Sequence, residues 1–172
     1  PAGEKLTNVS AIMNDIGRAA GRTGLAAVLG SKKLKAIFVK GKSRPEIVDR
    51  KAFLKIVEEK QKKAKNHPVS VAINQYGTAV LVNLVNGIGA WPTRNFSAGT
   101  FEEAEKISGE TLAKKYLIEP VGCWGCIIKC GRLVQAKTEN YDVPEHESPE
   151  YETIWALGAN CGIGNLPALL KM

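Results

Sequence analysis

Three of the four cysteines in this chain are close enough in sequence to bind one metal centre. Cys123, Cys126 and Cys130 form a C-x2-C-x3-C run. Three thiols within eight residues cannot all satisfy disulfide geometry locally, and a single further cysteine argues against a secreted disulfide scaffold. Gly122 and Gly125 would relieve the backbone crowding that arises when sulfurs converge, and would leave amide groups to point at sulfur. The spacing therefore predicts a metal site.

The residues alone leave the kind of metal open. An iron–sulfur cluster normally takes four thiolates, so its fourth ligand would be Cys161 or a cysteine beyond Met172. A Cys3His zinc site completed by His146 is the rival. Structural zinc sites usually pair two C-x2-C knuckles and this chain has one, which favours the cluster. Three buried cysteines without a metal are the remaining alternative.

A second candidate site is the arginine–glycine segment, residues 17–24. It holds two Gly-Arg pairs four residues apart and leads into a short predicted helix. Glycines permit close backbone approach and arginines supply forked donors, so the segment suits an anion such as a phosphate. It matches neither a Walker loop nor G-x-G-x-x-G. Taken alone, it is as often a surface turn as a ligand site.

The elements that would position these residues change in character near residue 45. Residues 14–42 predict a loop, a helix within 25–29 and a strand over 34–39, and residues 41–45 predict a boundary. Beyond it, apolar periodicity and breaker residues predict helices. The expected helices run from residue 49 to a stop at Asn66-His67-Pro68, over 76–89, after the capping box Thr100-Phe-Glu-Glu103, over 109–117, and over 150–160 with Gly162 at the end. The chain is thus predicted to be mainly helical after residue 45.

Composition and charge exclude several classes of protein. Apolar residues make up 44% and charged residues 24% of the chain, as in ordinary globular domains, and no apolar run is long enough to cross a bilayer. Residues 1–65 carry 16 basic and 6 acidic side chains, but the lysines over 51–65 follow helical spacing with Phe53 as the only aromatic among them. This indicates a solvated helix face rather than a nucleic-acid surface. Because the chain begins with Pro1 rather than Met, we expect it to be part of a longer protein.

Three groups of segments, taken in order, resemble one known family. The segments are Pro1-Ala-Gly-Glu4, Arg18-Ala-Ala-Gly-Arg22 and Gly30-Ser-Lys-Lys-Leu-Lys-Ala-Ile37; then Pro92-Thr-Arg-Asn-Phe96; then the cysteine run followed by Pro149-Glu-Tyr-Glu-Thr153 and Asn160-Cys-Gly162. Together they resemble the tungsten-containing aldehyde:ferredoxin oxidoreductases over essentially the whole chain. The resemblance implies that residues 1–44 end a β-rich domain covering a pterin, and that residues 45–172 begin a helical iron–sulfur domain.

The resemblance also implies an activity and its cofactors. Members of this family oxidise aldehydes to carboxylic acids on a bis-pterin tungsten centre, or a molybdenum centre in some members, and pass electrons through a [4Fe–4S] cluster to ferredoxin. A magnesium ion, a homodimer and a cytoplasmic location would accompany that assignment, without a nucleic-acid or membrane partner. The alternative is a small iron–sulfur or zinc-binding module with a basic interaction surface, but a module of that kind would hold all its ligands within the chain.

Residue roles follow from the same resemblance. Cys123, Cys126 and Cys130 resemble three of the four cluster ligands, with the fourth downstream of this chain. Cys161 then becomes a buried small apolar residue rather than a ligand. The residues that resemble the pterin-contacting segment are Arg18, Ala19, Ala20, Gly21 and Arg22. Glu150 resembles the carboxylate near the metal, with Glu152 as runner-up; the two point about 200° apart on a helix, so only one can face the site. The alternative for Glu150 is a first-turn residue favoured by the helix dipole.

Overall fold

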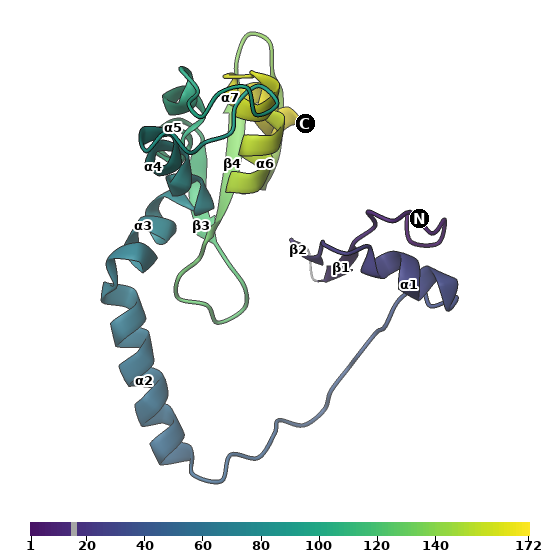
Figure 1. Ribbon diagram of the computed structural model, residues 1–172. Coiled ribbons are helices and arrows are strands. Elements are labelled where there is room, and N and C mark those ends of the chain that lie inside the picture. Colours follow the sequence, from purple (N-terminus) through teal and green to yellow (C-terminus); the bar gives the residue numbers. More distant parts are fainter. Residues whose placement is uncertain (15–16) are drawn as a thin grey trace. The chain divides into compact units, whose positions relative to one another are not determined.

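The computed structural model describes residues 1–14 and 17–172, which form two compact units (Figure 1). The first unit is Pro1–Val48 and the second is Asp49–Met172. No helix in the described part of the chain is both long and apolar enough to span a membrane. The loop expected from residue 14 includes Asp15 and Ile16, which lie outside the described residues.

The first unit contains a two-stranded antiparallel hairpin and one short helix. Strand β1 (Ile12–Asn14) pairs with β2 (Arg18–Ala20), and helix α1 spans Leu25–Ser31. The predicted strand over 34–39 is wrong, because these residues are extended without pairing to any described strand. Phe38 in the middle of this segment is 91% exposed.

Two glycines allow the first residues of the chain to approach α1. A Cβ at Gly30 would lie 1.9 Å from the carbonyl oxygen of Gly3, and a Cβ at Gly3 would lie 2.5 Å from that of Ala26. Any side chain at either position would clash with backbone, so the contact requires glycine on both sides. This gives a physical reason why glycine stands in two of the segments that carry the family resemblance.

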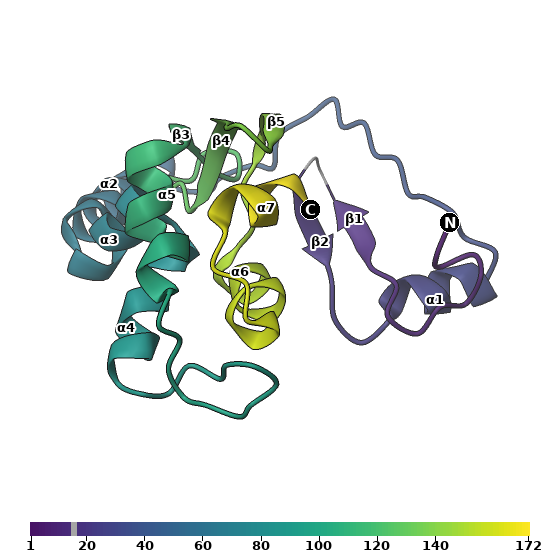
Figure 2. The ribbon, with the colours of Figure 1, turned by 90° about the horizontal axis from the view of Figure 1, so that it is seen from above.

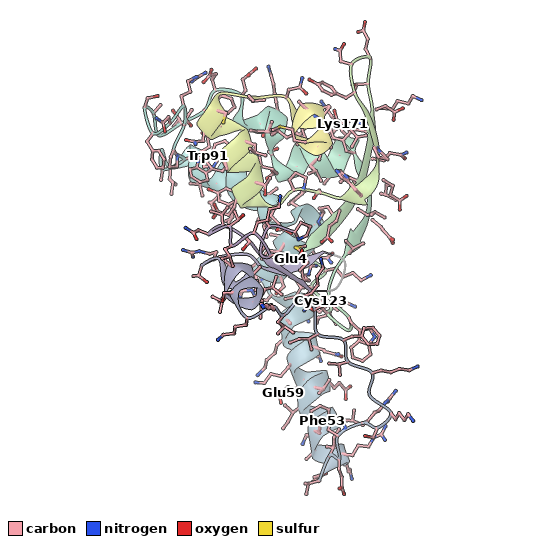
Figure 3. The ribbon with its side chains drawn as sticks, turned by 90° about the vertical axis from the view of Figure 1, so that its right-hand side faces the viewer. Glu4, Phe53, Glu59, Trp91, Cys123 and Lys171 are labelled. Carbon is pink, nitrogen blue, oxygen red and sulfur yellow. The ribbon has the colours of Figure 1, made fainter. Side chains whose placement is uncertain are left out.

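The second unit begins with a series of helices. The helices before the sheet are α2 (Arg50–Asn66), α3 (Pro68–Tyr76), the 3-10 turn η1 (Thr78–Val80), α4 (Leu81–Gly87), the 3-10 helix η2 (Ala104–Ile107) and α5 (Gly109–Lys115). Asp49 caps α2 by accepting a hydrogen bond from the Ala52 amide at 2.9 Å. None of the residues of α2 is buried, and side chains such as Phe53 and Glu59 project from it (Figure 3).

Two of the helix predictions in this region need correction. The helix expected over 76–89 is divided at Gly77, whose φ of 67° interrupts α3 before η1 and α4 begin. The capping box at 100–103 does not open an α-helix: η2 has Glu103 at its N-cap position without a side-chain cap. The Phe101 amide instead donates to Oδ1 of Asn86 at 2.7 Å.

A three-stranded antiparallel sheet follows, which the helical prediction missed. Its strands are β3 (Leu117–Val121), β4 (Gly131–Lys137) and β5 (Asp142–Glu147), with β4 in the centre. Alternate residues of β4, namely Arg132, Val134 and Ala136, are buried, so one face of the sheet is turned to the core. The described chain therefore mixes helices with small sheets and is not purely helical.

The last helices close the second unit. They are α6 (Tyr151–Leu157), the 3-10 turn η3 (Ala159–Cys161), ended by Gly162 in a left-handed conformation, and α7 (Leu166–Lys171). Helix α7 lies beside β5, where the Lys171 ammonium donates to the Asp142 carbonyl at 2.8 Å (Figure 2). The core consists of buried residues from the helices, the loop after α4 and the sheet: Ala79, Val82, Trp91, Phe101, Ala104, Ile107, Leu112, Val134, Ala136, Val143, Ile154, Ala159, Leu166, Leu169 and Leu170.

We expect truncation of Ile154 on α6 to destabilise the second unit strongly. Ile154 has no exposed surface, so Ile154→Ala removes buried apolar atoms and leaves a cavity, at a cost of about 2–5 kcal/mol in the free energy of unfolding. Ile163→Ala is the matched control because Ile163 is 36% exposed, and it should cost about 1 kcal/mol or less. Urea unfolding followed by tryptophan fluorescence measures both; equal losses would contradict this description of the core.

Candidate metal centre

The three clustered cysteines lie on one loop between two paired strands. This cysteine loop, residues 122–130, leaves the sheet at the end of β3 and returns at the start of β4 (Figure 1). Cys123 and Cys126 are exposed and Cys130 is half-buried. The Cys126 amide donates to the Cys123 carbonyl at 3.0 Å, and Gly125 between them has a φ of 73°. The strands thus fix both ends of a tight turn that carries all three thiols.

The donor set suits an iron–sulfur cluster, although its sulfurs are not gathered at one point. Three thiols on one loop are the donors that clusters use. Among the described residues, no three His, Cys, Asp or Glu side chains are grouped closely enough to hold a metal ion. The three thiols alone also fall one ligand short of the four thiolates that a cluster normally takes.

The two other candidate ligands are not positioned to complete the site. Nε2 of His146 lies 2.7 Å from the Leu170 carbonyl oxygen, so that ring nitrogen is engaged with α7. Cys161 is exposed and its thiol donates to the Ala156 carbonyl at 3.3 Å. The expectation that Cys161 is buried is therefore wrong: it ends the 3-10 turn η3 on the surface.

Arg132, which the sequence did not single out, ties the cysteine loop to helix α3. Its guanidinium donates to the carbonyls of Asn74 at 2.6 Å, Ile73 at 2.9 Å, and Lys129. The side-chain amide of Asn74 also donates to the Ile128 carbonyl at 2.8 Å. Arg132 on β4 therefore bridges the last turn of α3 and the end of the cysteine loop, and the Asn74 contact joins the two directly.

A small pocket beside Arg132 brings two predicted site residues together. The pocket is lined by Tyr76, Gly77, Thr78, Ala79, Cys130, Arg132, Ser148, Pro149 and Glu150. A Cβ at Gly77 would lie 3.1 Å from Nε of Arg132 and 3.1 Å from the Cys130 carbonyl oxygen, so glycine permits this close approach. Burial lowers the pKa of Arg132, and the nearby Cys130 and Glu150 oppose that effect.

Glu150 and Glu152 occupy different environments at the start of α6. The half-buried Glu150 carboxylate accepts a hydrogen bond from the Thr78 hydroxyl, and the same hydroxyl oxygen accepts from the Tyr151 amide at 2.9 Å. Glu152 is exposed. Glu150 stands at the N-cap position, yet its side chain makes no capping bond. Its carboxylate is therefore oriented by Thr78 rather than by the amides of its own helix.

The arginine–glycine segment lies in the first unit. Arg18, Ala19 and Ala20 form β2, and Arg18 donates to the Gly17 carbonyl at 2.9 Å. Gly21 and Arg22 follow it and are exposed. The segment is thus partly a strand rather than the loop the sequence predicted. A pocket of the first unit, lined by Glu4, Gly30, Lys33, Leu34 and Lys35, does not include this segment.

Residues 92–98, for which the sequence predicted no role, form a strained loop. Three consecutive non-glycine residues, Arg94, Asn95 and Phe96, have φ values of 47°, 55° and 64°. The amides of Arg94 and Asn95 donate to the carbonyls of Ala159 and Asn160, each at 2.9 Å. Such strain persists only where surrounding contacts enforce it. Two segments of the family resemblance, about 65 residues apart in sequence, are thereby paired through their backbones.

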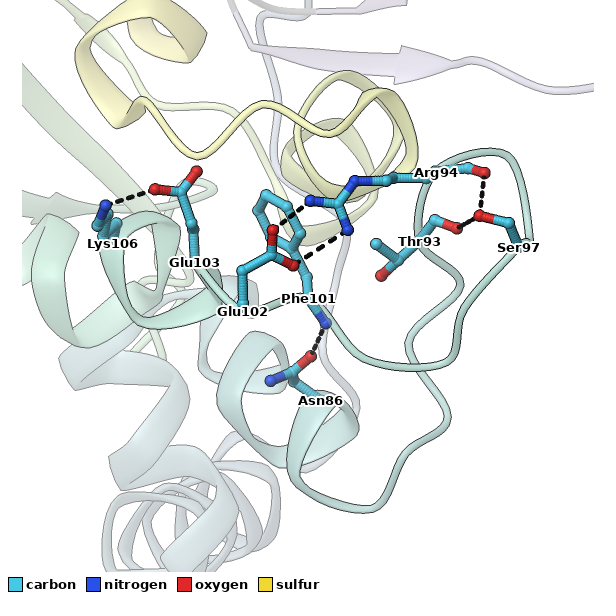
Figure 4. Close-up of polar contacts among 8 residues, drawn as sticks. All are labelled: Asn86, Thr93, Arg94, Ser97, Phe101, Glu102, Glu103 and Lys106. Carbon is cyan, nitrogen blue, oxygen red and sulfur yellow. Dashed lines mark hydrogen bonds and ion pairs between the residues drawn. The ribbon is translucent and has the colours of Figure 1, made fainter.

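An exposed ion pair between Arg94 and Glu102 connects this loop to the segment that follows it. The Arg94 guanidinium donates to both carboxylate oxygens of Glu102 and lies over the ring of Phe101, 5.4 Å from its centroid (Figure 4). The neighbouring Glu103 pairs instead with Lys106. The acidic residues of the expected capping box therefore hold side chains of the adjoining segments.

Comparison with known families agrees with this arrangement. Residues 1–41 match the N-terminal domain of aldehyde ferredoxin oxidoreductase, and residues 55–172 match domains 2 and 3 of the same family. The chain therefore belongs to the aldehyde ferredoxin oxidoreductase family.

The chain is also similar in sequence to individual members of this family. The chain is 51% identical over 172 residues to a tungsten-containing aldehyde ferredoxin oxidoreductase of Thermococcus kodakarensis, and 48% identical over 174 residues to one of Pyrococcus abyssi. Each alignment covers 99% of this chain and 28% of the relative. A more distant relative, the WOR-like subunit of an aliphatic sulfonate oxidoreductase of Pyrococcus furiosus, is 29% identical over 94% of the chain and 26% of its own length. The chain thus spans a little over a quarter of the proteins it matches.

We expect the ion pair of the strained loop to respond to acid. Arg94 holds the pKa of Glu102 below its usual 4.5, chiefly through their hydrogen bonds. The pair therefore stabilises the loop above that usual pKa, and the contribution is lost as the pH falls through the lowered value. In an NMR titration, Arg94→Gln should return the Glu102 midpoint to its ordinary range. Lys106→Gln removes the charge paired with Glu103 and should leave that midpoint unchanged; an ordinary midpoint in the parent chain would contradict this.

Proposed function

We propose that this chain is part of a tungsten-containing oxidoreductase subunit that oxidises aldehydes to carboxylic acids and passes electrons through a [4Fe–4S] cluster to ferredoxin. Family membership supports the class of enzyme. The observation that carries the proposal for this stretch is the pocket beside Arg132, because a predicted cluster ligand, Cys130, and a predicted active-site carboxylate, Glu150, both line it. Redox transfer and proton transfer would then take place in adjoining parts of one unit.

In this proposal the cysteine loop supplies three of the four cluster ligands. Cys123, Cys126 and Cys130 bind iron as thiolates, and the fourth ligand comes from outside residues 1–172. When bound, the tungsten pterin and the cluster supply the two-electron oxidation and the one-electron transfers. The cysteine loop holds its thiols between β3 and β4, while the carbonyl contacts of Arg132 keep its last residues against α3.

Glu150 is proposed as the carboxylate that holds or moves a proton near the substrate. Its hydrogen bond from Thr78 fixes one carboxylate oxygen, and its half-buried position restricts water. Glu152 is the alternative, since its exposed carboxylate is on a different face of α6 and would meet any part of the subunit packed there.

The first unit is proposed to contact the pterin. Arg18–Arg22 would provide donors to an anionic group, from the end of a β-rich domain over residues 1–44, with residues 45–172 beginning the helical iron–sulfur domain. From the resemblance alone, the proposal includes tungsten or molybdenum as the metal, a magnesium ion, a homodimer and a cytoplasmic location.

Loss of one cysteine should remove the cluster. In a full-length subunit that carries this sequence, Cys126→Ser replaces a thiolate by a hydroxyl, a poor ligand for a cluster iron, so iron and acid-labile sulfide should fall well below the parent protein. Cys161→Ser is the matched control and should retain both. Unchanged cluster content in Cys126→Ser, or stoichiometric zinc in the parent protein, would overturn the assignment.

The proton-transfer role is tested by two isosteric changes. Glu150→Gln in the full-length enzyme should leave tungsten, pterin and iron contents unchanged and lower aldehyde turnover by roughly 10²- to 10⁴-fold, the usual contribution of a positioned proton-transfer group. Glu152→Gln should have little effect. The reverse order would transfer the role to Glu152, and normal turnover in both variants would place it outside this chain.

A further inference from the structure

We propose that Arg132 is a positioning residue for the iron–sulfur cluster: it fixes the cysteine loop, and its buried positive charge raises the reduction potential of the cluster. This inference rests on the proposed function, because it takes the three cysteines as cluster ligands. The cysteine spacing gives no indication of a role for Arg132, which lies two positions beyond Cys130 in the sequence.

The geometry shows how Arg132 acts on the loop. Only 2% of Arg132 is exposed, and its guanidinium reaches three carbonyls at once, two on the last turn of α3 and one at Lys129, next to Cys130. A planar guanidinium has five donors in a fixed fork, so one side chain can hold two backbone segments at a set distance. An ammonium on the same strand would keep the charge without the fork.

The same position sets the electrostatics of the site. Arg132 and Cys130 line one pocket, and Gly77 allows the arginine side chain to approach the Cys130 backbone closely. A full positive charge in a buried region is weakly screened, so it acts strongly on charge changes nearby. Reduction adds one electron to the cluster. A fixed cation beside a ligand therefore favours the reduced form, and net charge is one of the factors that set cluster potentials.

Glu150 carries the opposing charge in this pocket, but its hydrogen bond is to Thr78 and not to the cysteine loop. Its carboxylate accepts from Thr78, whereas one of the three hydrogen bonds of Arg132 ends on the cysteine loop, at the Lys129 carbonyl. The carbonyls accept from the two terminal nitrogens of the guanidinium without removing its charge, and its buried Nε has no hydrogen-bond partner among the described residues.

The test is a potentiometric titration of the cluster, followed by electron paramagnetic resonance, in the full-length subunit. Arg132→Gln removes the charge but keeps an amide donor. When both proteins are held at the midpoint potential of the parent, the ratio of reduced to oxidised cluster in Arg132→Gln should be about tenfold lower than in the parent. This corresponds to a shift of the midpoint by about 59 mV to a more negative potential. Lys137→Gln is the matched control, since it removes one charge from the exposed end of the same strand and should leave the midpoint unchanged.

Arg132→Lys separates position from charge. This variant should keep the midpoint of the parent protein, yet release iron to a chelator several-fold faster because the fork that holds the loop is lost. The electrostatic role is overturned if Arg132→Gln and Lys137→Gln have the same midpoint. If Arg132→Gln retains no cluster, the iron-release rate of Arg132→Lys decides, and a rate equal to that of the parent overturns the positioning role. A parent protein without iron and sulfide would instead overturn the proposed function.

Discussion

The second unit depends on the need of one buried guanidinium for acceptors. Removing Arg132 from water is costly unless its donors find acceptors, and the carbonyls that accept from its two terminal nitrogens belong to the end of α3 and to the cysteine loop. These contacts hold the end of α3 against the last residues of the cysteine loop, and Gly77 permits the close approach of Arg132 and of the Cys130 carbonyl. The last cysteine thus lies beside a buried charge that is solvated by backbone.

Local patterns predicted the elements that local interactions stabilise. Helices α2, α5 and α6 were expected near their observed bounds, because capping residues such as Asp49 act on the helix they precede. The sheet was missed since its strands are defined by pairing with one another, and Pro120 and Pro144 disguise its outer strands. Only the short alternation of Val134 and Ala136 with the polar Gln135 and Lys137 in β4 signalled it.

The sequence predicts the candidate metal ligands and the carboxylate of the site, but it does not predict the residues that orient them. The C-x2-C-x3-C spacing alone indicates the three thiols, and the family resemblance indicates Glu150. The contacts that orient them come from distant residues: Thr78 on Glu150, Asn74 on the loop, and Ala159 on the strained segment. No spacing rule encodes such partners, because they are set by how helices and sheet pack. For the same reason Cys161 was expected in the interior and lies on the surface.

The strained loop has a consequence for how this unit opens transiently. Arg94 and Asn95 hold left-handed conformations only while their amides are bound to Ala159 and Asn160, so the loop and the 3-10 turn η3 must separate and rejoin together. The Trp155 indole, which donates to the Pro92 carbonyl at 2.8 Å, belongs to the same group of contacts. Two stretches distant in sequence therefore form one cooperative unit of local unfolding, whose opening would release stored backbone strain and expose the same amide hydrogens to exchange with solvent.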